Sequence, residues 1–209
     1  MKRTILQTIF FLLLTLPAMA QKSPISDSTI VDLSTLSEDF AYDMRYATTN
    51  NFLKEKVYDC DKCQLRYEAA KALVEANKQF MEKGYRIRLF DCYRSLDIQK
   101  KMWDIYPNPQ YVANPYKNGS QHNRGLAVDL TIEKLDGTPV DMGTDFDHFG
   151  KEAHHDYTAL SEEVLANRKL LKETLEASGF RSIRTEWWHY NFKSNYRYMP
   201  ANTPQDCGE

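Results

Sequence analysis

The sequence predicts an α+β domain with a central, mainly antiparallel sheet flanked by helices. Two amphipathic segments, at residues 64–83 and 161–178, carry apolar side chains at helical spacing. Shorter alternating or apolar runs typical of strands lie at residues 40–46, 85–91, 126–132, 180–184 and 186–192. Because these strands come in runs with helices between them, we expect a single α+β domain over residues 21–209.

Residues 1–20 have the pattern of a secretory signal peptide. Two basic residues precede an almost wholly apolar run at residues 5–16, and Ala18-Met-Ala20 supplies the small residues of a cleavage site. The run is shorter than the about 20 apolar residues of a membrane-spanning helix, which disfavours an uncleaved anchor. We therefore expect an exported protein, in the periplasm.

Composition limits the classes of partner. Removing 20 of the 209 residues leaves 189, enough for one domain with a sizeable core. The loss of Lys2 and Arg3 takes the formal charge from −2 to −4. A chain so close to neutrality lacks the basic footprint of a nucleic-acid-binding protein. We expect no nucleic-acid partner, no membrane span after residue 20 and no obligate protein partner.

The first half of the expected domain leads to a polar strand end. The strand at 40–46 is followed by a loop at 48–51, and Gly84 is well placed to end the helix at 64–83. The strand at 85–91 then delivers Asp91-Cys-Tyr-Arg94 to its end. Ser95 can cap a helix that reaches about residue 103.

The second half begins with an Asn-, Pro- and Tyr-rich stretch at 107–119 that we interpret as a loop. In the strand at 126–132, Asp129 shares a face with Ala127 and Thr131, opposite an apolar face. A turn at Asp136-Gly137 and an irregular acidic stretch at 140–155 precede the helix at 161–178. Gly179 is well placed to end that helix before the last two strands.

Two stretches carry the residue types of a metal site. His122 and Asp129 are seven residues apart with Gly125 between them, and Glu186 precedes His189 by three residues. Two imidazoles and one carboxylate can hold a zinc ion with an open fourth position, the arrangement of catalytic zinc. A regular strand would place Glu186 and His189 on opposite faces, so we predict a bulge or turn there.

The remaining histidines and the cysteines are not expected to carry the chemistry. His148, His154 and His155 lie in a polar loop without a carboxylate at a telling interval. In an exported protein the four cysteines can pair in three ways that sequence cannot separate. One Cys-x-x-Cys is a weak signal for a zinc or redox site, which favours structural disulfides or inert thiols. The four are Cys60, Cys63, Cys92 and Cys207.

These stretches resemble a known family. The matching motifs are Ser120-Gln-His122, Arg124-Gly125, Ala127-Val-Asp129 and Glu186-Trp-Trp-His189-Tyr190. Together they are similar to the D-alanyl-D-alanine dipeptidases of the VanX type, within the zinc D-Ala-D-Ala peptidases related in fold to Hedgehog. Further matches fall in family order over nearly the whole mature chain, among them Asp43-Met-Arg-Tyr46, Asp91-Cys-Tyr-Arg94 and Phe146-Asp147. The secretory signal, the cysteines and a shorter loop before Ser120 depart from the pattern.

The resemblance implies hydrolysis of D-Ala-D-Ala to two D-alanines, with one zinc ion per chain. Glu186 would be the catalytic base that takes a proton from the attacking water and passes it to the leaving amine. Arg94 would stabilise the oxyanion. The implied zinc ligands are His122, Asp129 and His189, and the implied substrate-binding residues are Tyr46, Ser120 and Asp147.

Two alternatives remain open. A D,D-carboxypeptidase trims terminal D-Ala from longer wall peptides with the same metal centre. Tyr46 and Asp147 argue against it, because they match positions that hold a free ammonium group where a longer peptide must pass. A non-catalytic zinc-containing binding module is the more distant alternative, and the presence of both Glu186 and Arg94 argues against it.

Overall fold

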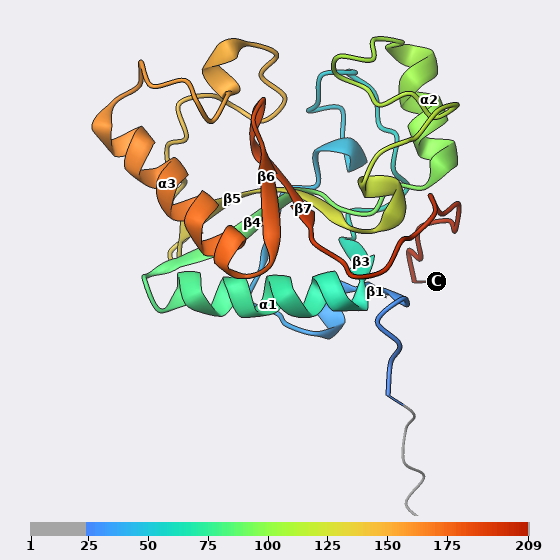
Figure 1. The fold of residues 1–209 in the computed structure, drawn as a ribbon, viewed down its shortest axis with the longest axis horizontal. Helices are drawn as coiled ribbons and strands as arrows, with labels where there is room; N and C mark the ends of the chain where they lie inside the picture. Colours follow the sequence, from blue (N-terminus) through green and yellow to red (C-terminus); the bar gives the residue numbers. More distant parts are fainter. Residues whose placement is uncertain (1–23, 209) are drawn as a thin grey trace, which may run out of the picture.

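The structure, a computed structural model, describes residues 24–208, so the expected signal peptide at 1–20 lies outside the described residues. Its centre is a five-stranded sheet in the order β2-β4-β5-β7-β6, beside a two-stranded sheet of β1 and β3 (Figure 1). All pairs in the large sheet are antiparallel except β2 with β4, which confirms the predicted α+β class. The strands are β1 (Ile30–Asp32), β2 (Ala41–Tyr42), β3 (Gln64–Arg66), β4 (Tyr85–Asp91), β5 (Ala127–Lys134), β6 (Phe180–Ile183) and β7 (Glu186–Phe192).

Three α-helices and four short 3-10 turns complete the described chain. The α-helices are α1 (Tyr67–Met81), α2 (Leu96–Ile105) and α3 (Glu162–Ala177). The 3-10 turns are η1 (Leu33–Thr35), η2 (Arg45–Ala47), η3 (His122–Arg124) and η4 (Lys151–Ala153). Helices α1 and α3 pack against the sheet and against each other, whereas α2 lies apart from them near the loops at the opposite side (Figure 1).

The two faces of β5 differ as its alternation predicts. Leu130 and Ile132 pair with Leu89 and Ile87 of β4, and all four side chains are fully buried in the apolar core. Each such side chain contributes roughly 1.5–3 kcal/mol relative to an exposed position. The alternate residues of β5, Asp129 and Thr131, lie on the other face of the strand.

Two predicted elements need correction. Residues 64–66 are strand β3, not the start of the first helix, because they pair with β1 and Arg66 N donates to Gly125 O. The predicted strand at 40–46 is reduced to Ala41–Tyr42 because β2 pairs only with β4, and the chain then turns through η2. That turn buries Tyr46, whose carbonyl accepts bonds from Val57 N and Tyr58 N.

The helix termini follow the capping signals. Ser95 Oγ accepts from Ile98 N at the start of α2, and Ser161 Oγ accepts from Val164 N at the start of α3. Gly84 and Gly179 follow α1 and α3 with φ of +84° and +92°, which glycine adopts at little cost. The α2 helix extends to Ile105, slightly beyond its predicted end.

Two irregularities in the sheet shape its polar end. On β6, Ser182 pairs with Tyr190 and the next residue, Ile183, pairs with Glu186, so residues 187–189 of β7 bulge away from β6. The bulge predicted at Glu186–His189 is therefore confirmed. On β4, an extra residue between Leu89 and Asp91 shifts the register and places Asp91 opposite Asp129.

The four cysteines form two disulfides, Cys60–Cys207 and Cys63–Cys92, as the interpretation of structural disulfides expects. Both pairs join segments near the polar end of the sheet, where β3, the end of β4 and the C-terminal tail meet. Within residues 24–208, no helix is both long enough and apolar enough to cross a membrane.

Candidate active site

Three ligand-type side chains converge at the polar end of β5 and β7. His122 Nε2 lies 3.2 Å from His189 Nδ1 and 3.3 Å from Asp129 Oδ2. His189 Nδ1 lies 2.9 Å from Asp129 Oδ1, and all three residues are buried. Tetrahedral zinc with bonds of about 2.0–2.1 Å separates its ligand atoms by about 3.3 Å. The trio therefore fits a small tetrahedral metal ion.

The local structure explains how distant residues meet. Asp129 and His189 are directly paired residues of β5 and β7, so their side chains share one face of the sheet. His122 comes from η3, which ends at Gly125 with φ of +68°. A Cβ at this glycine would lie 3.2 Å from Arg66 N, so both the conformation and the close approach favour glycine.

Each imidazole has an acceptor for its second ring nitrogen. His122 Nδ1 donates to the Cys92 carbonyl over 2.7 Å, which leaves Nε2 unprotonated toward the metal site. His189 Nε2 donates to Asn191 Oδ1 over 2.9 Å, which directs Nδ1 toward Asp129 and the metal site. Such outer hydrogen bonds fix the tautomer and the ring orientation of metal ligands.

The trio attracts positive charge. Burial lowers the pKa of His189, but the hydrogen bond and charge of Asp129, together with the charge of Glu186, outweigh it and raise this pKa to about 9. Burial opposes ionisation of Asp129, but the two histidines more than compensate and hold its pKa well below the usual range. Without a metal, His189 holds its proton tightly because of the negative charge of Asp129. A divalent cation would compensate the same negative charge.

Glu186 lies beside the trio because of the β7 bulge. Its Oε2 is 3.9 Å from His189 Nδ1, and its side chain is about one-third exposed. Burial raises the pKa of Glu186; His189 opposes this rise and Asp129 adds to it. A carboxylate with a raised pKa next to an open ligand position is suited to taking a proton from water.

Arg94 is fixed by a buried network. Its Nη2 pairs with Asp91 Oδ2, its Nη1 donates to Gln99 Oε1 over 3.0 Å, and its Nε donates to Tyr58 OH over 3.4 Å. Burial lowers the pKa of Arg94, but Asp91 outweighs this and keeps it above its usual range. Arg94 also borders the cavity that holds the trio, where a cation that does not deprotonate can stabilise an oxyanion.

Tyr46 and Asp147 form the other wall. Tyr46 OH donates to Asp147 Oδ2 over 2.9 Å. Burial, then the charge of Asp129, raises the pKa of Asp147 well above its usual range. Asp147 has a φ of 59°, in the left-handed region that Asp tolerates better than most residues. The third predicted substrate residue, Ser120, is half-buried, and its Oγ accepts from His122 N over 3.2 Å.

All eight predicted site residues border one cavity of about 240 Å³, smaller than the pockets that hold drug-sized ligands. Aromatic side chains line part of it, and the rings of Tyr111 and Phe149 stack with centroids 4.0 Å apart. His148, His154 and His155 do not border it. His155 is instead packed near Tyr190, and burial lowers its pKa to about 4.

Three supporting groups escaped the sequence interpretation. Asn191, which orients His189, lies two residues further along the same strand face, so strand periodicity alone could have indicated it. Asp91 pairs with Arg94 only because the β4 bulge turns it toward the site. The Cys92 carbonyl is a backbone group and has no sequence signal.

Comparison with known proteins agrees with this geometry. A family model described as D-ala-D-ala dipeptidase matches residues 26–203. The chain belongs to the D-ala-D-ala dipeptidase family. The predicted resemblance is thereby confirmed.

Individual relatives cover most of the chain. The chain is 32% identical over 174 residues to the D-alanyl-D-alanine dipeptidase of Escherichia coli (strain K12). The aligned region covers 83% of this chain and 90% of that relative. It is 32% identical over 171 residues to the D-alanyl-D-alanine dipeptidase of Enterococcus faecium. That alignment covers 71% of this chain and 84% of the relative. A structure of the LdcB LD-carboxypeptidase is 25% identical with a TM-score of 0.41, over 62% of this chain and 59% of that chain.

Proposed function

We propose that this chain is a zinc-dependent dipeptidase that hydrolyses D-Ala-D-Ala to two D-alanines. The observation that carries the proposal is the convergence of a metal-binding trio, a carboxylate and a buried guanidinium on one small cavity. Membership in the D-ala-D-ala dipeptidase family supports it independently. Zinc fits the donor set because two imidazoles and one carboxylate leave the fourth tetrahedral position open.

The chain's own residues divide the chemistry between them. His122, Asp129 and His189 would hold the zinc ion, which supplies a Lewis acid and activates water near neutral pH. Glu186 takes the proton of the attacking water and delivers it to the leaving amine. Arg94 stabilises the negative charge that develops on the carbonyl oxygen; losing a comparable donor typically costs on the order of 10²–10³ in turnover.

The opposite wall would select a free amino group. Asp147 is half-buried and has a raised pKa, so an ammonium group beside it would supply the missing positive charge. Tyr46 orients the Asp147 carboxylate through its hydroxyl. A longer peptide presents a neutral amide at the same place and leaves Asp147 without a countercharge. We infer that this wall limits the substrate to a dipeptide, with Ser120 as a further substrate contact.

The test separates metal binding from proton transfer. The purified protein should bind one zinc ion and release D-alanine from D-Ala-D-Ala, and it should lose activity to a chelator and regain it with zinc. Glu186→Gln should lower kcat by about 10²–10⁴-fold with zinc affinity nearly unchanged. Glu162→Gln, on the exposed first turn of α3, is the matched control and should behave as the wild type. An active Glu186→Gln variant would refute the assignment of the base.

We also propose that the protein is exported to the periplasm after removal of residues 1–20. The signal pattern supports this, and so do two disulfides in a chain of this size, because disulfides persist in oxidising compartments. In that location, scavenging of wall fragments is a more suitable role than removal of cytoplasmic precursors. Amino-terminal sequencing of protein expressed with its own leader should start at Gln21, and an intact Met1 would contradict the proposal.

A further inference from the structure

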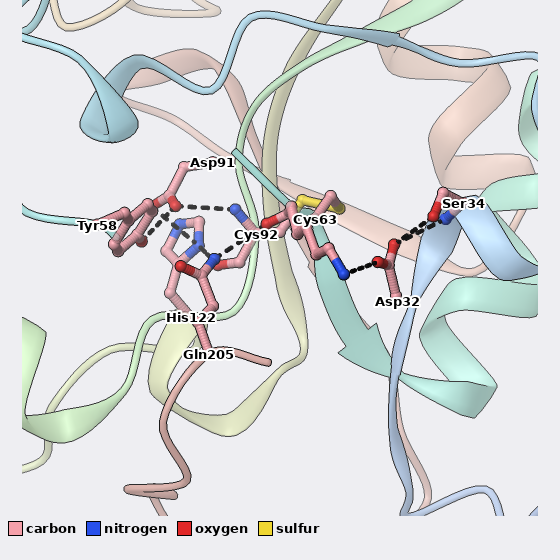
Figure 2. The surroundings of a disulfide bond; sticks show 9 residues. Asp32, Ser34, Tyr58, Cys63, Asp91, Cys92, His122 and Gln205 are labelled. Atoms are coloured by element: carbon pink, nitrogen blue, oxygen red, sulfur yellow. Dashed lines mark hydrogen bonds and ion pairs between the residues drawn. A yellow bond between two sulfur atoms is a disulfide. The ribbon is translucent and has the colours of Figure 1, made fainter. Parts of the chain in front are cut away.

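The Cys63–Cys92 disulfide lies next to His122, one member of the metal-binding trio (Figure 2). Cys92 is the first residue after β4, where the ladder with β5 has ended. Cys63 immediately precedes β3, and both cysteine residues are fully buried. The cross-link therefore joins the small β1–β3 sheet to the connection that leads from β4 to Arg94.

The backbone of Cys92 forms hydrogen bonds with two residues of the candidate site, His122 and Asp91. Its carbonyl accepts the 2.7 Å hydrogen bond from His122 Nδ1, and its N–H donates to Asp91 Oδ1 over 2.8 Å (Figure 2). Asp91 is the partner of Arg94, and Arg94 N donates to His122 O over 3.2 Å. One short stretch thus orients a metal ligand and the oxyanion cation together.

Hydrogen bonds also hold that stretch, since Tyr93 OH donates to Thr203 O over 2.9 Å and Asn123 Nδ2 donates to Arg94 O over 2.8 Å. Tyr93 N donates to Gln64 O over 2.9 Å, so β3 is the structure that faces it. On the far side, Leu33 N donates to Cys63 O over 2.9 Å, which ties Cys63 to the scaffold. The disulfide is the covalent member of this support, and it fixes the Cα of the residue whose carbonyl receives His122.

The second disulfide offers a built-in comparison. Cys60–Cys207 ties the C-terminal tail to the segment before β3, and both residues are partly exposed. Cys60 Sγ lies 3.8 Å from Gln205 Oε1 in the C-terminal tail, and neither Cys60 nor Cys207 borders the cavity that contains the trio. Its sequence separation is 147 residues, against 29 for Cys63–Cys92. The loop-entropy model therefore predicts a larger stability loss from removing Cys60–Cys207.

We propose that the Cys63–Cys92 disulfide is a positioning element of the metal site, which holds the Cys92 carbonyl against His122 and thereby raises metal affinity. The proposal rests on the proposed zinc function. Removing this disulfide lets the Cys92–Arg94 stretch move, so His122 loses its fixed tautomer and orientation. Loss of an outer-shell partner of this kind typically costs about 10–100-fold in metal affinity.

The experiment compares two double variants, Cys63→Ala/Cys92→Ala and Cys60→Ala/Cys207→Ala. Zinc dissociation constants come from competition with a chromophoric chelator, and melting temperatures come from circular dichroism of the metal-free proteins. We expect the first variant to bind zinc about 10–100-fold more weakly and the second to bind within twofold of wild type. The melting temperatures should instead depend on the length of the loop that each disulfide closes. The larger fall is expected for Cys60→Ala/Cys207→Ala, which removes the longer loop.

The outcomes separate the two proposals. Wild-type protein that binds no zinc would overturn the proposed function itself. Wild-type zinc affinity in Cys63→Ala/Cys92→Ala, or equal weakening in both variants, would overturn only the positioning role. The His122 Nδ1 proton gives a second measurement by NMR, since it should exchange with solvent faster in the first variant only.

A reduction experiment covers the case in which Cys63→Ala/Cys92→Ala does not fold. Folded, zinc-loaded Cys60→Ala/Cys207→Ala protein retains only the buried disulfide. A trialkylphosphine cleaves that S–S bond to two thiols and becomes the phosphine oxide with an oxygen atom from water. Zinc release to a chelator should accelerate after reduction, and an unchanged release rate would refute the positioning role.

Discussion

Metal binding at this site should be a competition with a proton on His189. In the metal-free protein the pKa of His189 is about 9, so at pH 7 only about 1% of molecules have this ring unprotonated. A metal ion must displace that proton. The apparent zinc affinity should therefore rise about tenfold per pH unit between pH 7 and 8.5, and should lie about 100-fold below its limit at pH 7.

The same proton stabilises the metal-free fold. The folded pKa of about 9 exceeds the unfolded value of about 6.5, so the stabilisation is fully present below pH 6.5 and is lost as the pH rises through 9. The shift of about 2.5 units corresponds to about 3 kcal/mol. Asp147 and Glu186, whose pKa values are also raised, contribute in the same direction as they ionise.

Two measurements check this reasoning. Urea unfolding of the metal-free protein at pH 6, 7.5 and 9 should show a falling free energy of unfolding, with a smaller fall in Asp129→Asn because the main partner charge is gone. Calorimetric zinc titrations in buffers of different ionisation enthalpy should show about one proton released per zinc at pH 7.5. A flat or rising stability together with pH-independent zinc affinity would refute the competition.

Three further substitutions test the supporting groups. Arg94→Lys should lower kcat by about 10²–10³-fold in a D-alanine release assay, because lysine does not present a planar fork to both Asp91 and the oxyanion; near-normal turnover would contradict this. Asn191→Leu should weaken zinc binding about 10–100-fold in chelator competition by leaving His189 Nε2 without its acceptor, and unchanged affinity would show that this bond is dispensable. Gly125→Ala should lower the free energy of unfolding by roughly 1–3 kcal/mol, because φ is +68° and the new Cβ would lie 3.2 Å from Arg66 N; an unaltered urea midpoint would count against that strain.

Local patterns predicted most of the secondary structure and two details of the site. Alternation alone placed Asp129 on the polar face of its strand, where it pairs with His189. The three-residue interval between Glu186 and His189 required a bulge, and the β6–β7 register contains one. These features follow from the chain's own periodicity, so sequence was sufficient.

Other features depend on partners that are distant in sequence. Residues 64–66 continue the apolar pattern of α1, but pairing with β1 makes them a strand, because tertiary hydrogen bonds override local helix propensity. The Tyr46–Asp147 contact joins residues 101 positions apart, and nothing in the local pattern around either residue indicates it. Their proposed roles came from family resemblance, and the structure adds the contact itself.

The disulfide pairing shows the same limit more sharply. Four cysteines allow three connectivities, and only the meeting of β3, the end of β4 and the C-terminal tail selects one. No local pattern in the sequence connects the cysteines with the metal site. That connection depends on the Cys92 carbonyl, a group that every residue type carries.

The central claim is that this cavity hydrolyses a free dipeptide and excludes longer wall peptides. The direct test supplies the purified zinc-loaded chain with D-Ala-D-Ala or with a pentapeptide ending in D-Ala-D-Ala, each with and without a chelator, and measures released D-alanine. We expect chelator-sensitive release from the dipeptide and little from the pentapeptide, because in the proposed function the hydrogen-bonded pair of Tyr46 and Asp147 selects a free ammonium group. Release from the pentapeptide alone would identify a D,D-carboxypeptidase, and release from neither would favour a binding module; both results would contradict the account.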